Sequence, residues 1–165
     1  MKPIIPKPSP NHGKRPSDTI DCIVLHADAG RSEAGTLDWI SRPAAGVSYH
    51  YLVGRTGTVY QCVPDKRRAW HAGKSQLGGK ADVNDYSIGV SFANDQRGEL
   101  YPEVQIAAGV ELVAFLCERY GIPADRIVTH QAVAVPEGRK RDPGPLFPLA
   151  AFLERVAAAR LAPDD

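Results

Sequence analysis

Two histidines lie at the ends of apolar runs that are typical of buried strands. His26 follows the run IDCIVL, and His130 follows IVT. Both runs are rich in β-branched residues, which favour strands. Because ligands of open α/β sheets gather at the carboxyl ends of strands, the two imidazoles could converge on one metal ion. Cys22 would lie about 13 Å from His26 along an extended strand, too far to share a metal with it.

Asp142, in the segment GRKRDPGP, is the candidate for a third ligand. Pro143 and Pro145 restrict the backbone after it and would fix its carboxylate in place. The residues alone leave open a solvated loop, in which Asp142 and the neighbouring cations neutralise each other. Two histidines, one carboxylate and a water form a catalytic rather than a structural zinc set, because the fourth position stays open.

Other polar side chains near these positions could assist a reaction. Lys140 lies two residues before Asp142, so an extended chain places both on one face, where a lysine can stabilise charge on a carbonyl oxygen. Tyr49 is a second donor candidate, although a strand tyrosine also serves as core packing. Trp70 and His71 stand together in a loop, where the tryptophan could line a cleft and pack on a sugar or anchor the loop to the core.

The elements that must position these residues follow an α/β pattern. Apolar and β-branched runs predict strands at 20–27, 47–53, 58–63, 87–93 and 126–129, with a hairpin turn at 54–57. Apolar spacing predicts helices at 32–41, 103–120 and 148–161, and the segments 67–79 and 131–144 are predicted to be loops. We therefore expect one α/β domain over 20–165, with a central mixed sheet flanked by helices. Residues 1–19 are rich in proline and should run over the surface in extended form.

The composition excludes several classes of partner. The 165 residues are 43% hydrophobic, enough for a core without a disulfide framework. Because 20 Lys+Arg face 19 Asp+Glu, giving a net charge of +1, neither nucleic acid nor an anionic membrane is an expected partner. The three cysteines lie far apart in apolar runs and are predicted to be buried free thiols.

The sequence also carries expectations about location. The N-terminus has no apolar segment typical of a secretion signal, and no stretch approaches the ~20 apolar residues that span a bilayer. We expect a soluble monomer in the cytoplasm, or one that is released to the cell wall if it is of phage origin.

Several segments, in order, resemble the type 2 N-acetylmuramoyl-L-alanine amidases. This family includes cytosolic muropeptide-recycling amidases, phage endolysins and animal peptidoglycan-recognition proteins. The matching segments are IVLHAD around His26, VSYHYLVGRTGTVYQCV at 47–63, RAWHAG at 68–73, NDYSIGVSF at 84–92, IVTHQAV at 127–133 and GRKRDPGP at 138–145. The resemblance covers nearly the whole chain from residue 20 onwards.

The resemblance implies a site and an activity. The activity is zinc-dependent hydrolysis of the amide bond between N-acetylmuramic acid and L-alanine, in peptidoglycan or in soluble muropeptides, with the zinc in a surface groove. The residues implied are the zinc ligands His26, His130 and Asp142, the catalytic Lys140 and Tyr49, and the substrate-binding His71, Trp70, Ser91 and Asn94.

One position departs from the recycling branch of the family. Recycling amidases carry a glutamate, assigned as general base, in the strand after the motif SIG, where this sequence has Ser91. Serine cannot take a proton from water at neutral pH. The departure therefore leaves the general base unassigned and makes Tyr49 and Lys140 more important for catalysis. Phage and animal members also have a small residue there, so the departure does not imply inactivity.

Two other functions fit parts of the pattern. Some family members lose the zinc and only recognise muropeptides, and loss of a metal ligand marks them. Because all three candidate ligands are present, we favour an enzyme over a non-catalytic binding module. A metallopeptidase that cuts stem peptides would also be compatible with the chemistry, but the motif set argues against it.

Overall fold

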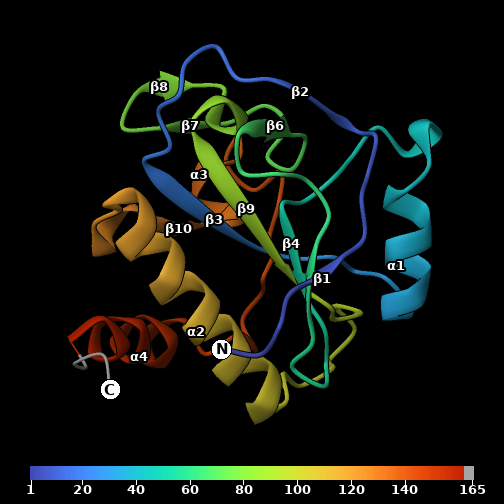
Figure 1. The fold of residues 1–165 in the computed structure, drawn as a ribbon, viewed down its shortest axis with the longest axis vertical. Coiled ribbons are helices and arrows are strands. Elements are labelled where there is room, and N and C mark those ends of the chain that lie inside the picture. Colours follow the sequence, from blue (N-terminus) through green and yellow to red (C-terminus); the bar gives the residue numbers. More distant parts are fainter. Residues whose placement is uncertain (162–165) are drawn as a thin grey trace.

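The computed structural model describes residues 1–161, which fold around a mixed sheet with the strand order β1-β5-β4-β9-β3-β10 (Figure 1). Its strands are β1 (Ile5–Pro6), β3 (Cys22–Ala27), β4 (Tyr51–Val53), β5 (Val59–Gln61), β9 (Ser87–Phe92) and β10 (Ile127–Thr129). Strands β4, β9, β3 and β10 are parallel neighbours, while β5 returns antiparallel to β4 as the second arm of a hairpin. The mixed sheet and the hairpin confirm the predictions from the sequence.

Three of the four α-helices described begin and end close to where the sequence predicts, and the short third helix lies largely within a segment predicted to be a loop. The four helices are α1 (Glu33–Ile40), α2 (Glu103–Tyr120), α3 (His130–Val133) and α4 (Leu149–Leu161). Helix α1 starts after Ser32, whose hydroxyl accepts a hydrogen bond from the Gly35 amide at 3.0 Å. Helix α2 is capped by Gly121, which has φ +65°, a left-handed conformation that closes helices and favours glycine. Among the described residues, no helix has the length and apolar character needed to cross a membrane.

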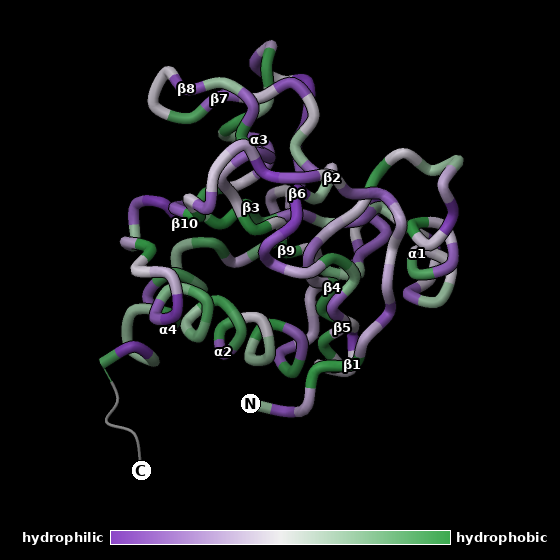
Figure 2. Tube along the Cα trace, turned by 45° about the horizontal axis from the view of Figure 1, so that its top comes forward, coloured by the Kyte–Doolittle hydropathy of each residue, from purple (hydrophilic) through white to green (hydrophobic). Residues whose placement is uncertain are grey.

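The two faces of the sheet have different coverings. On β3, Ile23 and Leu25 face the main core, which α2 and α4 complete as they pack against each other on that side (Figure 1). Cys22 and Val24 face the other way, against a smaller cluster built from loop residues. Because side chains alternate along a strand, His26 emerges on the loop-covered face. Figure 2 shows the contrast, with hydrophobic residues along α2 and hydrophilic residues along β2 and β6.

Short strands that the sequence does not predict cover the loop side. They are β2 (His12–Lys14), β6 (Arg67–Ala69), β7 (Gln76–Leu77) and β8 (Lys80–Ala81), and they pair as β2 with β6 and β7 with β8. The predicted loop at 67–79 is therefore wrong in part, and the predicted loop at 131–144 begins inside α3. Strand β6 has the sequence RRA and no apolar alternation, so its extended pairing depends on a partner far away in the sequence.

The N-terminal segment is extended and tied to the structure near the site. Asn11 is 2% exposed. Its side-chain nitrogen, Nδ2, donates to the carbonyl oxygens of Ile40, Arg42 and Val47 at 3.1, 2.9 and 3.1 Å. These carbonyls belong to the end of α1 and to the chain that leads into β4. The segment therefore fixes the path of the backbone that carries Tyr49.

Arg15 fastens the same segment to the loops on the other side. Its guanidinium donates to the carbonyl oxygens of Asp65, Asn84, Asp85 and Ser87, at 3.0, 3.2, 3.1 and 2.8 Å. These carbonyls come from the loop before β6 and from the turn that leads into β9. One side chain thus joins three segments that are distant in sequence.

We expect Arg15→Ala to lower the free energy of unfolding by about 2 kcal/mol or more, because it leaves several carbonyl groups without their charged donor. Urea denaturation followed by circular dichroism measures the change. Lys14→Ala, at the exposed neighbouring position, is the matched control and should change the value by less than about 0.5 kcal/mol. Equal effects of the two substitutions would contradict a fastening role for Arg15.

His50 is a buried imidazole that links the strands behind the site. Its Nδ1 accepts a hydrogen bond from the Gly89 amide at 2.9 Å, and its Nε2 lies 2.9 Å from the carbonyl oxygen of Arg67. The acceptor role of Nδ1 places the proton on Nε2, which donates to Arg67. Burial, followed by the positive charge of Arg15, lowers the pKa of His50 from 6.5 to about 3. The ring is therefore neutral at physiological pH.

This lowered pKa gives stability a defined pH dependence. Above pH 6.5 the ring is neutral in both states, so it contributes no slope. Between pH 6.5 and about 3 the unfolded chain binds a proton that the folded chain excludes, so the free energy of unfolding falls as the pH falls. His50→Asn keeps an acceptor for the Gly89 amide but does not titrate. In urea denaturation between pH 7 and 4, the free energy of unfolding of the variant should fall less steeply than that of the wild type. If the free energies of the two proteins fell in parallel with pH, His50 would not be a source of the pH dependence.

Candidate active site

A groove of about 500 Å³ opens over the carboxyl ends of β3 and β10. Tyr49, Trp70, His71, His130 and Asp142 line it, together with Lys140. His26 lies beneath this surface and is 1% exposed. The groove therefore gathers most of the residues that the sequence singles out, from segments that span the greater part of the chain.

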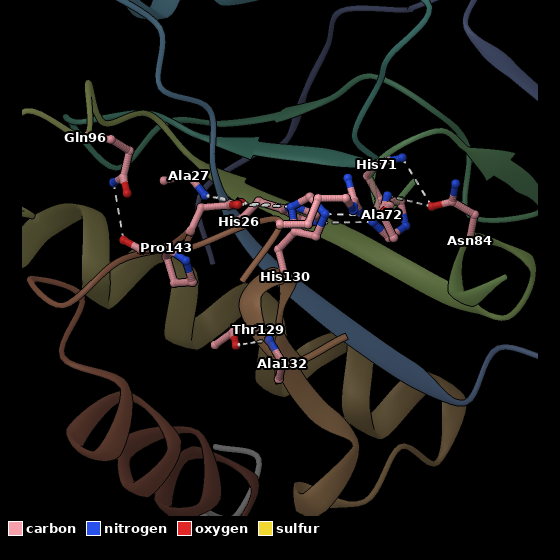
Figure 3. A network of polar contacts seen from close by, with 12 residues as sticks. His26, Ala27, His71, Ala72, Asn84, Gln96, Thr129, His130, Ala132 and Pro143 are labelled. Carbon is pink, nitrogen blue, oxygen red and sulfur yellow. Dashed lines mark hydrogen bonds and ion pairs between the residues drawn. The ribbon is translucent and has the colours of Figure 1, made fainter. Parts of the chain in front are cut away.

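Three of these residues bring one ligand atom each to a common point. The Nδ1 atoms of His26 and His130 lie 3.1 Å apart (Figure 3). Each of them lies 3.2 Å from Oδ2 of Asp142. The second carboxylate oxygen of Asp142 is 3.0 Å from Nδ1 of His130. All ligand atoms of the group lie within 4.8 Å of one another, an arrangement that could hold a metal ion.

The parallel pairing of β10 with β3 explains why the two histidines meet. Thr129 pairs with Leu25, so the residues that follow them, His130 and His26, leave adjacent strands at the same edge of the sheet. The Thr129 hydroxyl caps α3 by accepting a hydrogen bond from the Ala132 amide at 3.1 Å. His130 is therefore the first residue of that helix.

Asp142 reaches the histidines from the loop that precedes α4. Its carbonyl oxygen accepts from the Gln131 amide at 3.1 Å, and its carboxylate accepts from the Ala27 amide at 3.3 Å. The carbonyl oxygen of the next residue, Pro143, accepts from Gln96 Nε2 at 3.2 Å and from a tyrosine hydroxyl. Hydrogen bonds thus fix the backbone of Asp142 and of Pro143, and a further hydrogen bond from the Ala27 amide orients the carboxylate.

The protonation states of His26 and Asp142 suit metal binding. Burial lowers the pKa of His26 to about 4, even though the neighbouring carboxylate of Asp142 opposes this effect. Burial alone would raise the pKa of Asp142, but its contacts with His130 and His26 outweigh burial and hold the pKa well below its usual value. A neutral imidazole and an ionised carboxylate are the forms in which these side chains bind metals.

The spacing of the donors fits a small tetrahedral cation. Bonds of ~2.0–2.1 Å in a tetrahedral zinc site give ligand-to-ligand edges of about 3.3 Å. The separations of 3.0 to 3.2 Å between the three ligand atoms are close to this value. The nitrogen, nitrogen and oxygen set is also the kind of set that catalytic zinc sites use. The residues present therefore fit the metal that the sequence implies.

Tyr49 and Lys140 stand at the rim of the group. The ring of Tyr49 lies 5.3 Å from the ring of His26, centroid to centroid. Burial, reinforced by the carboxylates of Asp28 and Asp142, raises the pKa of the Tyr49 hydroxyl, so it stays protonated and acts as a donor. Lys140 is exposed and lines the groove beside Asp142.

His71 and Trp70 both line the groove, but they differ in burial. His71 is 7% exposed, with its Nδ1 at 2.9 Å from Nε2 of His26 and its Nε2 at 3.0 Å from Oγ of Ser87. Trp70 is half-buried, and its amide donates to the Ser48 hydroxyl at 3.0 Å. The structure therefore places Trp70 where it can meet a ligand and His71 directly behind His26.

Ser91 and Asn94 do not line the groove. Ser91 pairs with His26 across β9 and β3, is fully buried, and has a hydroxyl without a hydrogen-bond partner among residues 1–161. The Asn94 side chain binds the backbone of Gln96 and Glu99, and so shapes the loop after β9. The structure thus brings neither side chain to the surface that a substrate would touch.

Several groove residues are not predicted from the sequence, among them Asp28, Asn84, Arg139 and Arg141. Asp28 lines the groove and accepts from Thr36, from the Gly30 amide and from the Asn94 amide. It stands two residues after His26, so alternation along an extended chain was a signal that could have found it. Arg139 also lines the groove, but it is bound to backbone carbonyls, which nothing in its local sequence indicates.

Comparisons with known proteins agree with this geometry. A family model described as N-acetylmuramoyl-L-alanine amidase matches residues 16–145. The 1,6-anhydro-N-acetylmuramyl-L-alanine amidase AmpD of Enterobacter cloacae is 32% identical over 88% of this chain and 86% of its own. A crystal structure of a selenomethionine derivative of AmpD has a TM-score of 0.78 and 31% identity, covering 94% of this chain and 95% of that chain.

A further structure is that of AmiD from Escherichia coli in complex with the substrate anhydro-N-acetylmuramic acid-L-Ala-D-gamma-Glu-L-Lys. It has a TM-score of 0.74 and 31% identity, and covers 82% of this chain but only 57% of that chain. The resemblance seen in the motifs is thus confirmed over most of the chain. This chain belongs to the N-acetylmuramoyl-L-alanine amidase family, and its activity is hydrolysis of the amide bond between N-acetylmuramic acid and L-alanine.

Proposed function

We propose that this amidase depends on zinc held by His26, His130 and Asp142, and that it acts on soluble anhydro-muropeptides. The observation that carries the proposal is the convergence of two Nδ1 atoms and one carboxylate at the floor of the groove, with 3.0 to 3.2 Å between them. Similarity to AmpD over nearly the whole chain supports the soluble substrate, because that relative is named for the 1,6-anhydro form. The monomeric state and the cytoplasmic setting expected from the sequence stay predictions.

The three ligands would hold the metal through Nδ1 of His26, Nδ1 of His130 and a carboxylate oxygen of Asp142. When bound, zinc supplies Lewis-acid activation of water and of the scissile amide carbonyl. With three protein ligands, the metal would keep one position for water or substrate, as in other catalytic zinc sites.

Lys140 and Tyr49 would act on the reacting atoms. The ammonium of Lys140 approaches from the exposed rim and stabilises negative charge that develops on the carbonyl oxygen. The Tyr49 hydroxyl, kept protonated by its raised pKa, orients the attacking water or the carbonyl by donating a hydrogen bond. Neither role requires Ser91, which is buried beneath the groove.

The walls of the groove suit a sugar joined to a peptide. Trp70 lines one wall and offers an aromatic surface for a sugar ring. Arg141 lines the groove beside Lys140 and is exposed, so it can meet the carboxylates of a stem peptide. A substrate with a muramic acid and an acidic peptide would therefore have a partner for each of its parts.

Mass spectrometry of the reaction products tests the proposal. Zinc-loaded protein is incubated with a soluble anhydro-muropeptide and, separately, with intact sacculi, each with and without a chelator. We expect release of a free L-alanyl peptide from the soluble substrate, loss of this release with chelator, and its recovery on addition of zinc. Faster release from sacculi would refute the soluble substrate, and binding without cleavage by zinc-loaded protein would leave a recognition module.

Lys140→Ala should lower turnover by about 10²–10³-fold, the loss typical of removing one donor to a developing oxyanion. Zinc content, measured by atomic absorption, should equal that of the wild type, because Lys140 is not among the proposed ligands. Lys66→Ala, an exposed lysine outside the groove, is the control and should keep wild-type turnover. Near wild-type turnover of Lys140→Ala would show that its assigned role is wrong.

A further inference from the structure

The dipeptide His71-Ala72 contacts both His26 and His130, through the imidazole nitrogens that do not belong to the ligand group. Nε2 of His26 lies 2.9 Å from Nδ1 of His71, and Nε2 of His130 lies 3.1 Å from the carbonyl oxygen of Ala72 (Figure 3). Each imidazole therefore has one nitrogen at the common point of the ligand group and the other nitrogen on this dipeptide. The orientation of both rings depends on where the dipeptide lies.

These contacts also determine which nitrogen carries the proton. A carbonyl oxygen can only accept, so Nε2 of His130 is protonated and Nδ1 presents its lone pair to the site. When Nδ1 of His26 binds a cation, the proton of this neutral ring stands on Nε2 and is donated to His71. His71 then donates from its own Nε2 to the Ser87 hydroxyl at 3.0 Å. Every ring nitrogen in this arrangement has a partner.

Asn84 fixes the dipeptide itself. Its side-chain oxygen accepts from the amides of His71 and Ala72, at 3.2 and 2.8 Å (Figure 3). Asn84 is 5% exposed and lies in a 3-10 turn, Val83–Asp85, directly before β9. This buried oxygen thus holds the backbone amides of both residues of the dipeptide, and Arg139 Nη2 donates to the Ala72 carbonyl oxygen at 2.8 Å.

Gly89 makes room for this arrangement on the sheet. A β-carbon at position 89 would lie 2.5 Å from the ring of His71, closer than real contacts allow. The imidazole of His71 therefore lies directly against β9, in contact with His26 of the neighbouring strand β3. This packing leaves the ring little freedom to turn away from its partners.

We propose that Asn84 is a positioning residue, which holds His71 and Ala72 so that the Nδ1 atoms of His26 and His130 are preset for the metal. This inference rests on the proposed zinc dependence. Residues that orient metal-binding histidines typically contribute 10–100-fold to metal affinity. The role of His71 is then to support His26 rather than to bind substrate.

The test measures zinc affinity without substrate, by competition with a chromophoric chelator. Asn84→Ala removes the acceptor oxygen and should weaken zinc binding by about 10–100-fold. Asn84→Asp keeps an oxygen at that place and should bind zinc at least as tightly as the wild type. Asn11→Ala removes another buried, loop-fixing asparagine that does not contact the dipeptide, and should leave zinc affinity unchanged.

A second pair of variants keeps the test decisive if Asn84→Ala does not fold. His71→Leu removes the acceptor for His26 and should weaken zinc binding to a similar extent, while His71→Asn keeps an oxygen near the position of Nδ1 and should retain it. Nitrogen-15 NMR of the wild type should show the His130 ring protonated at Nε2, and Asn84→Ala should show a mixture of the two tautomers.

The outcomes separate this inference from the proposed function. If the wild type binds no zinc, the proposed function fails. If the wild type binds zinc and Asn84→Ala binds it equally well, the positioning role fails while the amidase proposal stands. A raised KM for Asn84→Ala with unchanged zinc affinity would assign Asn84 to substrate contact and overturn the inference.

Discussion

The parallel pairing of β10 with β3 is the contact on which the site depends. Its register places Thr129 beside Leu25, and the residue that follows each of them is a histidine. A shift of one residue would send one imidazole to the opposite face, because side chains alternate along a strand. The main core on the helix side keeps this register, since Ile23, Leu25 and Ile127 would lose their burial if the strands slipped.

The loop-covered face has an unusual density of buried imidazoles. His26, His50, His71 and His130 are each at most 7% exposed. Burial favours the neutral ring, and a neutral ring still needs a partner for each nitrogen, or it would cost stability. Backbone groups supply many of these partners. The orientation of the rings therefore depends on loops whose backbone is held in place. The hydrogen bonds of Arg15 and Asn84 to the loop backbone meet this need.

The sequence was sufficient for the parts of the site that follow strand ends and local motifs. The convergence of His26 and His130 could be predicted because both follow apolar, β-branched runs, and the geometry of Asp142 agrees with the hypothesis of a third ligand. The supporting residues could not be predicted, because Arg15 and Asn84 act on backbone groups of remote segments. Such contacts leave no periodic pattern in the sequence. The strand form of β6 was missed for the same reason, since its partner β2 lies more than fifty residues earlier.

The N-terminal prolines have a consequence beyond their effect on helix formation. The amides of Lys7 and Ser9 point inward to the carbonyls of Gln61 and Cys62, at 2.9 and 2.8 Å, and so extend the pairing of β1 with β5. Amides of alternate residues in such a strand point outward, and here those positions are Pro6, Pro8 and Pro10, which have no N–H to donate. The segment therefore covers an open sheet edge and offers few donors of its own to another strand. An exposed edge of this kind is a common starting point for aggregation, and the proline spacing protects the fold against it.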